Sequence, residues 1–477
     1  MARARRGGAN AGVLGTRDTK VSTGISGLDA ALFGGLPDGR ATLLFGGPGS
    51  GKTTLALQIL AHGAKIGEPG IFVAFEENSR NLIANAASFG WGLAALERRH
   101  ALAFLDARLE PDVVQAGAFD LRGLLATLEV KARELGARRI VFDGIDVLLA
   151  MLDDPAAERA ELFRIHHWLL AQQLTGILTA KSEGADPFAN ERFRFAAYAA
   201  DCALVLTRTD ADGVSERDVS ILKYRGSPFA ENRAPFVIGP AGLEVAEQNP
   251  TTRVERTSTE RLSTGVPRFD IMLNGGYFRA ASVLITGQPG TAKSTLSGAF
   301  VAEACKRNER AVYVGFDEPH DETIRNLASV DIQLAPHIAS KRLCMLDVRS
   351  LSDSAEVQLM RIRSGIRAHG ASCVVIDPIS ALAKSSSNAA ARSVIARFIH
   401  WCKLEAITLV CTSLVAGARP DEEITELGAS TLCDTWVHLS YAERGGERNR
   451  AITIVKSRGT AHSNQVRELV LSDAGIT

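Results

Sequence analysis

The sequence lacks long apolar runs and a targeting segment. No stretch reaches about 18 uninterrupted apolar residues, so we expect no transmembrane helix. The basic start, MARARRGGANAG, is not followed by an apolar segment, which excludes a secretory signal. We therefore expect a cytoplasmic protein whose residues 1–17 form a flexible tail.

The sequence also lacks a CxxC pair and an excess of charge of either sign. Its seven cysteines include no CxxC pair and lie mostly in apolar runs, a pattern that favours buried, reduced thiols over disulfides or a metal site. Lys and Arg (54) balance Asp and Glu (54), so the composition gives no electrostatic case for nucleic-acid binding. A local basic stripe within a neutral chain stays compatible with these counts.

What the sequence does contain is a long internal repeat. The segment 22-STGISGLDAALFGGLPDG-39 aligns with 263-STGVPRFDIMLNGGYFRA-280, and 241 positions separate Lys52 from its counterpart Lys293. A separation of this size indicates a duplicated domain rather than a short-period array.

A second pair of matching segments supports the same duplication. The segment 223-KYRGS-227 aligns with 456-KSRGT-460 at a separation of 233 positions. The stretch between the repeats is polar, contains Pro250 and has no apolar periodicity, so it is typical of a linker. We predict three parts after the tail, which are a first domain over 18–247, a linker over 248–261 and a second domain over 262–477.

Both repeats alternate short apolar runs with longer helical segments. Such runs are typical of strands buried on both faces of a mostly parallel sheet. The sequence therefore predicts an α/β fold, formed twice, with helices on both faces of each sheet. The predicted strands are 41–45, 71–75, 139–143, 174–180 and 203–207 in the first repeat, and 282–286, 312–316, 373–377, 406–413 and 436–441 in the second.

A phosphate-binding pattern lies early in the first repeat. Residues 46-GGPGSGKT-53 match GxxxxGK[ST], directly after a predicted strand and before a predicted helix over 54–65. Glycines let backbone N–H groups converge on phosphates, and the start of the helix adds the positive end of a dipole. We predict an ATP and Mg²⁺ site in which Thr53 also binds the metal. Its nucleotide contacts are Gly47, Gly49, Ser50, Gly51, Lys52, Thr53 and Thr54.

The second repeat carries 287-GQPGTAKS-294, in which Ala292 replaces the last glycine of the pattern. Alanine at this position costs little if its φ angle is negative. We therefore expect a second ATP site with Ser294 on the metal, and an inactive second site is the alternative. The predicted nucleotide contacts are Gly290, Thr291, Ala292, Lys293, Ser294 and Thr295.

Single aspartates end one buried strand in each repeat. Asp143 and Asp377 occupy the position from which a carboxylate holds Mg²⁺ beside a P-loop. A cap for the following helix is the alternative role. We predict Asp143 and Asp377 as metal ligands.

Two adjacent acids follow the second strand of each repeat. They are Glu76 with Glu77 and Asp317 with Glu318. Carboxylates at a strand end suit the activation of a water or a hydroxyl. We take Glu77 and Glu318 as general bases and the other two acids as assisting groups, with solvated surface acids as the alternative.

With these motifs the chain resembles the family of KaiC, the circadian-clock ATPase and autokinase. The likeness runs from about residue 18 to about residue 470 and includes both P-loops, the paired acids and the repeated K-x-R-G-[ST] motif. The segment 425-TELGASTLCDT-435 is similar to the one in which the family carries adjacent phosphorylated Ser and Thr. The resemblance implies two RecA-like domains and an ATP-driven homohexamer in the form of a double ring.

The resemblance also implies roles for residues of this chain. The first domain would hydrolyse ATP, and the second would phosphorylate Ser430 and Thr431 of the neighbouring subunit, with Thr425 as a third hydroxyl. At the equivalent place the first domain has Tyr198 and Asp201 instead of a Ser-Thr pair. Four basic residues would reach a neighbour's nucleotide, where positive charge stabilises phosphoryl transfer, unless they form only a solvated strand face. They are Lys223, Arg225, Lys456 and Arg458.

The chain departs from the family pattern at two places. It stops at Thr477, whereas the family continues into a regulatory loop and a tail that binds KaiA, so we expect no KaiA-like partner and keep a KaiB-like partner open. Lys384 stands where the family often has arginine, which keeps the charge but loses the planar fork.

Two other functions share this core. A RecA- or DnaB-like DNA-dependent motor ATPase needs basic loops, and the sequence has no run of Lys and Arg of that sort. A scaffold that binds ATP only to assemble does not need the catalytic set of Lys52, Glu76, Glu77 and Asp143. ATP hydrolysis stimulated by DNA tests the first alternative, and turnover by a Lys52→Ala variant tests the second.

Overall fold

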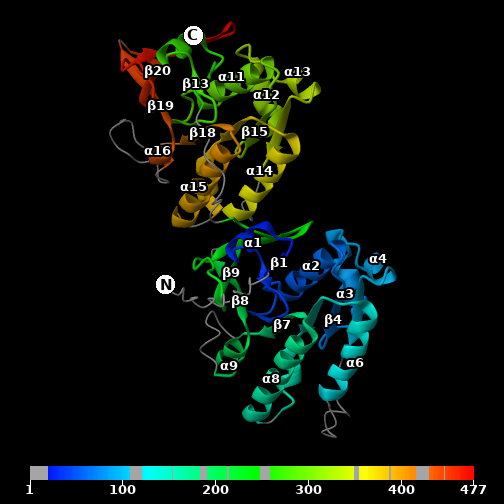
Figure 1. Ribbon diagram of the computed structural model, residues 1–477. Helices are drawn as coiled ribbons and strands as arrows, with labels where there is room; N and C mark the ends of the chain where they lie inside the picture. The colour runs from blue at the N-terminus through cyan, green and yellow to red at the C-terminus, as the bar shows by residue number, and fades with distance from the viewer. Residues whose placement is uncertain are drawn as a thin grey trace, which may run out of the picture. The chain divides into compact units, whose positions relative to one another are not determined.

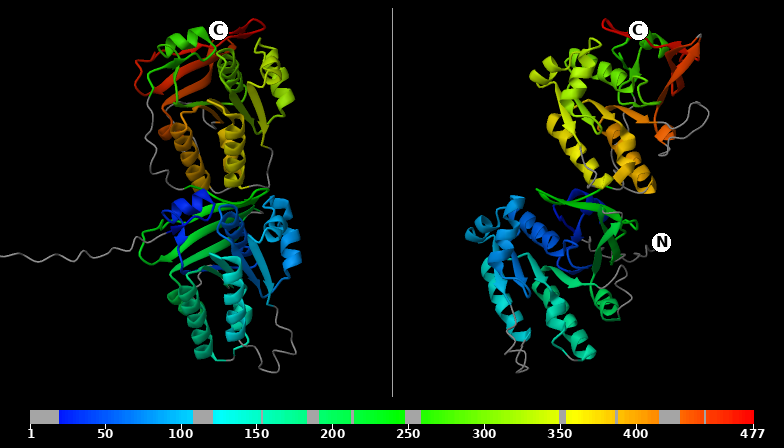
Figure 2. Two further views of the ribbon diagram at one scale, coloured as in Figure 1. Left: turned by 45° about the vertical axis from the view of Figure 1, so that its right-hand side comes forward. Right: turned by 180° about the vertical axis from the view of Figure 1, so that it is seen from behind.

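The chain folds into two compact units. The computed structural model describes residues 20–107, 121–152, 154–182, 191–211, 214–247, 258–348, 354–385, 388–414, 429–444 and 446–477. The main division between the units falls between residues 248 and 249. Each unit is built on one large sheet, as Figures 1 and 2 show. The predicted tail over 1–17 and most of the predicted linker lie outside the described residues.

The described strands have the same order in the two sheets around the strand that leads into the P-loop. The first sheet has the order β11-β10-β9-β8-β3-β7-β6-β4-β5, and the second has β21-β20-β19-β14-β18-β17-β15-β16. The strand β3 pairs in parallel with β7 and β8, and β14 pairs in parallel with β18 and β19. The predicted α/β fold with mostly parallel sheets is therefore confirmed in both units.

The strand bounds lie close to the predicted ones near the centre of each sheet. The first sheet contains β3 (Ala41–Gly46), β4 (Gly70–Ala74), β5 (Leu102–Asp106), β6 (Arg139–Asp143), β7 (Thr175–Lys181), β8 (Cys202–Ala211), β9 (Val214–Tyr224), β10 (Ala234–Gly239) and β11 (Gly242–Val245). The second contains β14 (Ser282–Gly287), β15 (Ala311–Gly315), β16 (Leu343–Asp347), β17 (Cys373–Asp377), β18 (Thr408–Leu414), β19 (Thr435–Arg444), β20 (Glu447–Ser457) and β21 (Arg467–Glu468).

Helices cover both faces of each sheet. In the first unit α1 (Ser26–Ala31), α2 (Lys52–Lys65), α3 (Ser79–Asn85) and α4 (Leu93–Arg98) pack on one face, and α6 (Leu121–Leu135), α7 (Ile145–Leu149), α8 (Pro155–Gln172) and α9 (Glu191–Ala199) on the other. In the second unit α10 (Pro267–Met272), α11 (Lys293–Lys306) and α12 (His320–Ala328) pack on one face, and α14 (Ala355–His369) and α15 (Asn388–Leu404) on the other.

The first unit has a hydrophobic core on each face of its sheet, and successive side chains of the central strand β3 belong to these two cores in turn. Leu43 and Phe45 lie in the core beneath α6 and α8, whereas Leu44 lies in the core beneath α2. Successive side chains of a strand point to opposite faces, so a continuous apolar run serves two layers of helices. This is why the uninterrupted apolar runs of the sequence mark the central strands.

The duplication extends to individual hydrogen bonds. Asp29 of α1 accepts hydrogen bonds from Ser22 Oγ at 2.7 Å and from the backbone N–H of Thr23 at 2.8 Å. Asp270 of α10 accepts the same pair from Ser263 at 2.5 Å and from Thr264 at 2.7 Å. The same carboxylate therefore fastens the entry to each repeat.

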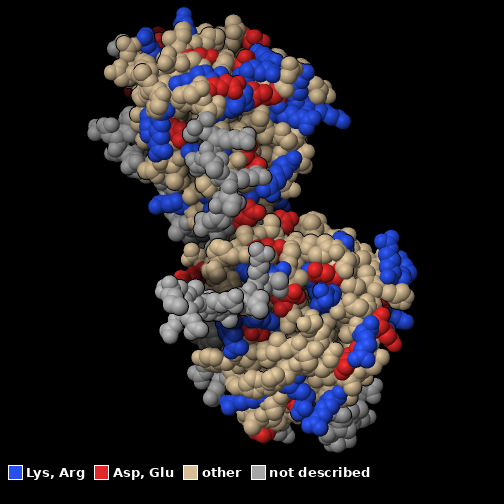
Figure 3. Space-filling model, in the orientation of Figure 1, with Lys and Arg blue, Asp and Glu red and all other residues tan. Residues whose placement is uncertain are grey.

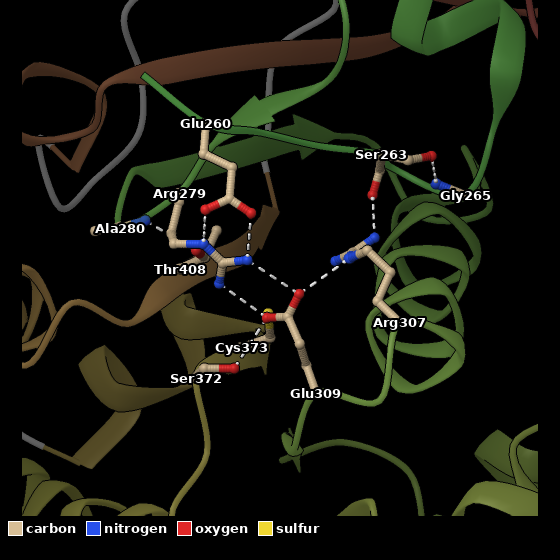
Figure 4. A network of polar contacts seen from close by, with 10 residues as sticks. All are labelled: Glu260, Ser263, Gly265, Arg279, Ala280, Arg307, Glu309, Ser372, Cys373 and Thr408. Atoms are coloured by element: carbon tan, nitrogen blue, oxygen red, sulfur yellow. Dashed lines mark hydrogen bonds and ion pairs between the residues drawn. The ribbon is translucent and has the colours of Figure 1, made fainter. Parts of the chain in front are cut away.

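A network of charged residues lies at the edge of the second sheet where its parallel strands begin (Figure 4). Glu309 accepts hydrogen bonds at 3.0 Å from Arg279 Nη1, Arg307 Nε and Ser372 Oγ, and Arg279 also contacts Glu260 at 2.5 Å. Burial alone would raise the pKa of Glu309, but these hydrogen bonds outweigh it and lower the pKa to about 2. The network ties together the segments that enter β14, β15 and β17.

The thiols and the helices agree with two expectations. All seven cysteines are free, and all of them except Cys344 are buried, which confirms the predicted buried thiols. Within the part of the chain that the structure describes, no helix combines the length and apolarity that a bilayer crossing requires.

Candidate nucleotide sites

The first P-loop joins β3 to α2. Gly49 and Gly51 have φ angles of 68° and 99°, in the left-handed region that glycine adopts without strain. The ammonium group of Lys52 donates to the carbonyls of Gly46 at 2.6 Å and Gly47 at 3.0 Å. Burial lowers the pKa of Lys52, although nearby carboxylates oppose the shift. The loop thus encloses a lysine at the start of a helix, as a phosphate site requires.

Hydroxyl and carboxylate oxygens meet beside this loop. Thr53 Oγ1 donates to Asp143 Oδ2 at 3.0 Å, and Thr179 Oγ1 donates to Asp143 Oδ1 at 2.7 Å. Burial raises the pKa of Asp143, so a cation is a favourable partner for its charged form. These oxygens suit Mg²⁺, which takes few protein ligands and completes its shell with water and phosphate. Among the described residues no three His, Cys, Asp or Glu side chains form a denser metal cluster.

The paired acids of the first site have different partners. Glu76 Oε1 lies 2.5 Å from Lys181 Nζ, at the end of β7. Glu77 Oε1 accepts a hydrogen bond at 3.0 Å from Asn85 Nδ2 on α3. The backbone N–H of Lys181 donates to Asp146 Oδ1 at 3.1 Å. The end of β7 therefore brings Lys181, which the sequence analysis did not predict, to the paired acids of the candidate site.

The second P-loop repeats the hydrogen bonds of the lysine, but it has alanine where the first loop has the glycine before that lysine. Lys293 Nζ donates to the carbonyls of Gly287 at 2.9 Å and Gln288 at 2.8 Å. Ala292 has a φ angle of 81°, so the condition under which alanine would cost little is not met. An L-residue in this region is strained because its Cβ crowds the following carbonyl. The loop nevertheless keeps its shape, and burial lowers the pKa of Lys293.

Six of the predicted residues of the second site line one cavity of about 170 Å³, whereas Thr291, Ala292, Thr295, Lys456 and Arg458 do not line it. Asp377 Oδ2 accepts a hydrogen bond at 2.5 Å from the hydroxyl of Tyr313, and Asp377 Oδ1 accepts one from Thr412. Ser294 is exposed and contacts the Tyr313 hydroxyl rather than Asp377. The cavity is lined by Pro289, Gly290, Lys293, Ser294, Tyr313, Gly315, Asp317, Glu318, Thr323, Asp377, Pro378 and Leu414.

The second acid of each pair has a matching partner in both units. Glu318 Oε2 accepts from Asn326 Nδ2 on α12 at 3.3 Å, as Glu77 does from Asn85. The threonines that bind the strand-end aspartates, Thr179 and Thr412, also correspond at a separation of 233 positions. A residue-by-residue comparison of the repeats could have found both pairs. Tyr313 could not be found in this way, because the first unit has Phe72 at its place.

The four basic residues of the repeated motif do not join their own P-loops. Lys223 Nζ donates to carbonyls at the end of α9, including that of Ala200 at 2.7 Å, and Arg225 donates to Tyr198 O at 2.7 Å. Directly after Ala200, Asp201 and Cys202 lie beside the beginning of β3. Asp201 N donates to Ala41 O, and Cys202 pairs with Thr42. The P-loop follows the other end of β3, which is roughly 17 Å away at about 3.3 Å per residue.

The second unit repeats this arrangement at α16 (Ala429–Leu432). Arg458 Nη2 donates to Thr431 O at 3.2 Å, and Asp434 N donates to Ser282 O at the beginning of β14. Thr431 is exposed, and burial lowers the pKa of Lys456. In the first unit, Tyr198 stands at the place of Thr431 and is 66% exposed. Thr425 lies outside the described residues, as do the side chains of Ser430 and Lys384.

Two mostly parallel sheets with a P-loop after the central strand define a pair of RecA-like P-loop ATPase units. The family model described as "ATPase: KaiC" matches residues 21–250 and 262–477. The chain therefore belongs to the KaiC family of ATPases.

Curated relatives cover nearly the whole chain. The Circadian clock protein KaiC2 of Synechocystis sp. is 38% identical over 461 residues, which are 96% of this chain and 81% of the relative. The Circadian clock oscillator protein KaiC of Picosynechococcus sp. is 34% identical, over 96% of this chain and 89% of the relative. A protein of the same name from Prochlorococcus marinus (strain MIT 9313) is 33% identical, with coverage of 96% and 92%.

Proposed function

We propose that this chain is an ATP hydrolase and serine/threonine autokinase that works as a double-ring homohexamer assembled by ATP. The domain over 18–247 hydrolyses ATP. The domain over 262–477 transfers the γ-phosphoryl group to Ser430 and Thr431 of the adjacent subunit and returns it to ADP. The words "circadian clock" in the names of the relatives support a timing role. We place this role in the cytoplasm, with a KaiB-like protein as partner.

One observation carries the transfer between subunits. Thr431 and Arg458 lie at the edge where β14 begins, whereas Lys293 follows the edge where β14 ends. A strand of six residues separates the acceptor from the ATP of its own chain by roughly 17 Å, too far for in-line transfer. A neighbour's ATP closes this gap if the acceptor edge of one subunit packs against the P-loop edge of the next.

The chain's own residues divide the chemistry among them. Lys52 and Lys293 bind phosphates, and Mg²⁺, when bound near Asp143 or Asp377, neutralises charge on them. In the second site the hydroxyl oxygen of the acceptor residue bonds to the γ-phosphorus, and ADP leaves. Glu318 accepts the proton of that hydroxyl. In the first site Glu77 accepts a proton from water in the same way. The neighbour's basic residues stabilise the charge of the transition state.

Phosphosite mapping on the purified full chain tests this function. We expect Mg-ATP alone, with no second protein, to place phosphate on Ser430 and Thr431, and expect Glu318→Gln to reduce the rate by about 10²-fold or more. Glu322→Gln is the matched control. Glu322 is an exposed acid in the first turn of α12, the helix that begins two residues after Glu318. An unmodified wild-type chain, or equal phosphorylation of the Glu318→Gln variant, would contradict the autokinase.

A DNA-dependent motor has no comparable support. On the face shown in Figure 3, Lys and Arg are interspersed with Asp and Glu over the described surface of each unit. Motors of this kind depend on positive charge gathered along the nucleic-acid path. Stimulation of ATP hydrolysis by single-stranded DNA would favour the motor over the autokinase.

A further inference from the structure

The two nucleotide sites differ by a coordinated exchange at one place. Lys181 of β7 pairs in register with Gly46, the residue that enters the first P-loop, and Leu414 of β18 pairs with Gly287 in the same way. The backbone N–H of Lys181 donates to the carboxylate of Asp146, whereas that of Leu414 donates to the hydroxyl of Ser380. The charged residues Lys181 and Asp146 of the first site thus correspond to the neutral residues Leu414 and Ser380 of the second.

The side chain of Lys181 extends from this strand end to the paired acids. Its Nζ lies 2.5 Å from Glu76 Oε1, and both side chains are partly exposed, at 50% and 37%. Asp143 and Asp146 also act electrostatically on this lysine and on Lys52, the adjacent P-loop lysine. Without Lys181, Glu76 would lose this cation while the negative charges of Asp143 and Asp146 remain nearby.

An ion pair this exposed contributes little to folding, because water screens it and two long side chains lose rotamer freedom. Its position therefore points to function. Glu76 has several rotatable bonds, and the hydrogen bond from the ammonium group of Lys181, whose backbone is anchored by Asp146, favours the rotamer that keeps the carboxylate beside the P-loop. The second site, in which phosphate goes to a side chain, has no lysine at the equivalent place.

We propose that Lys181 is a positioning residue for ATP hydrolysis in the first site, and that it holds the Glu76 carboxylate at the P-loop while Asp146 anchors the strand end that carries it. The proposal rests on the proposed ATP hydrolase function and assigns this pair to the water-using site alone. It explains why the second unit has neither a lysine nor an aspartate at the positions equivalent to Lys181 and Asp146.

Steady-state kinetics on the full chain tests the proposal. The background is Lys293→Ala, so that hydrolysis reports the first site. We expect Lys181→Leu, which copies the second site, to lower kcat about tenfold with KM for ATP changed less than about twofold, because transition-state alignment is lost and nucleotide binding is not. Lys181→Arg should recover kcat to within about threefold of the parent, since it keeps the charge.

A matched control and a structural readout complete the test. Lys131 is an exposed lysine of the first unit, paired with Glu134 at 3.6 Å, and Lys131→Leu should leave kcat unchanged. A crystal structure of the Lys181→Leu variant should show the Glu76 carboxylate in a new rotamer, with the Glu77–Asn85 hydrogen bond intact.

Two kinds of result would overturn the proposal. Unchanged kcat in Lys181→Leu, a rise in KM alone, or no recovery in Lys181→Arg would each remove the positioning role while hydrolysis by the parent stands. A parent protein with no ATP hydrolysis would instead remove the hydrolase function and this proposal with it.

Discussion

The residue directly before α11 has a backbone conformation suited to glycine. Ala292 has a φ angle of 81°, and Gly51 at the same place in the first loop has one of 99°. The penalty for an L-residue in this region is about 1–2 kcal/mol, because Cβ crowds the carbonyl that follows. The second P-loop therefore holds strain that the first one lacks.

Replacing Ala292 by glycine should relieve this strain. We expect Ala292→Gly to raise the free energy of unfolding of the second unit by about 1 kcal/mol, measured by urea denaturation of the full chain. Gly51→Ala is the reciprocal variant and should destabilise the first unit by more, because its Cβ would also lie 2.9 Å from Ile238 Cδ1. A destabilised Ala292→Gly variant would mean that the φ angle is not the source of strain.

At the scale of elements, the Glu309 network fastens the segments that enter three strands of the second sheet. The first unit has Glu68 at the same place, but its partner is Arg139, the first residue of β6, whose Nε donates to it at 2.7 Å. The second unit has Cys373 where the first has Arg139, and it takes its cations from Arg279 and Arg307 instead. The two units therefore have a glutamate at the same position, Glu68 or Glu309, but the arginines that pair with it come from different elements.

Glu309→Gln should therefore lower the stability of the second unit by about 1–3 kcal/mol at neutral pH, because two arginines lose a partly buried anion. The folded-state pKa of Glu309, about 2, lies below its ordinary value of 4.5. Its stabilisation is thus complete above pH 4.5 and is lost as the pH falls toward 2. Urea denaturation of both proteins across this range should give free energies of unfolding that converge in acid.

Glu260→Gln is the matched control for that comparison. Glu260 contacts the same Arg279, but its side chain is 55% exposed. Water screens a pair of this kind, so we expect almost no change in stability. Equal losses in the two variants would contradict a special role for Glu309.

The same scale shows which elements can be predicted from sequence. The runs 139–143 and 373–377 coincide with β6 and β17, because strands buried on both faces are continuously apolar. The edge strand β5 was not predicted, since its residues are only partly buried and its apolar signal is short. The strand β20, 447-ERNRAITIVKS-457, begins with polar residues and lies in an antiparallel ribbon, so it lacks that signal as well.

The candidate sites divide along a similar line. P-loops and strand-end acids are local patterns, so the sequence alone predicts Lys52, Lys293 and Asp143 as members of the candidate sites. The contacts of Lys181 with Glu76 and of Tyr313 with Asp377 join residues more than 60 positions apart. No local pattern marks such pairs, because only the strand order of the sheet brings them together.

At the scale of the whole molecule, the edge on which the basic residues lie determines how subunits would cooperate in the proposed ring. Arg225 binds the end of α9 near the beginning of β3, and the P-loop follows the other end of that strand. In a closed ring each subunit presents one edge to the neighbour before it and the other edge to the neighbour after it. A complete site would then take Glu77 from one subunit and Arg225 from the next.

Mixing two inactive variants tests this arrangement. Glu77→Gln and Arg225→Ala should each hydrolyse ATP at least about 10²-fold more slowly than wild type, because one lacks the general base and the other lacks the transition-state cation. In rings formed from equal amounts of both, about a quarter of the first sites combine an intact Glu77 with a neighbour's intact Arg225. Hydrolysis by the mixture should therefore recover to about a quarter of the wild-type rate.

The mixture must assemble for this result to have meaning, so native mass spectrometry with and without ATP accompanies it. We expect six-subunit particles that contain both variants when ATP is present. Mixed rings with no recovered hydrolysis would mean that Arg225 serves the nucleotide of its own chain or none at all. Because the strand β3 keeps Arg225 and the P-loop of one chain at opposite edges of the sheet, recovery in mixed rings is the result that this fold requires of an active site shared between subunits.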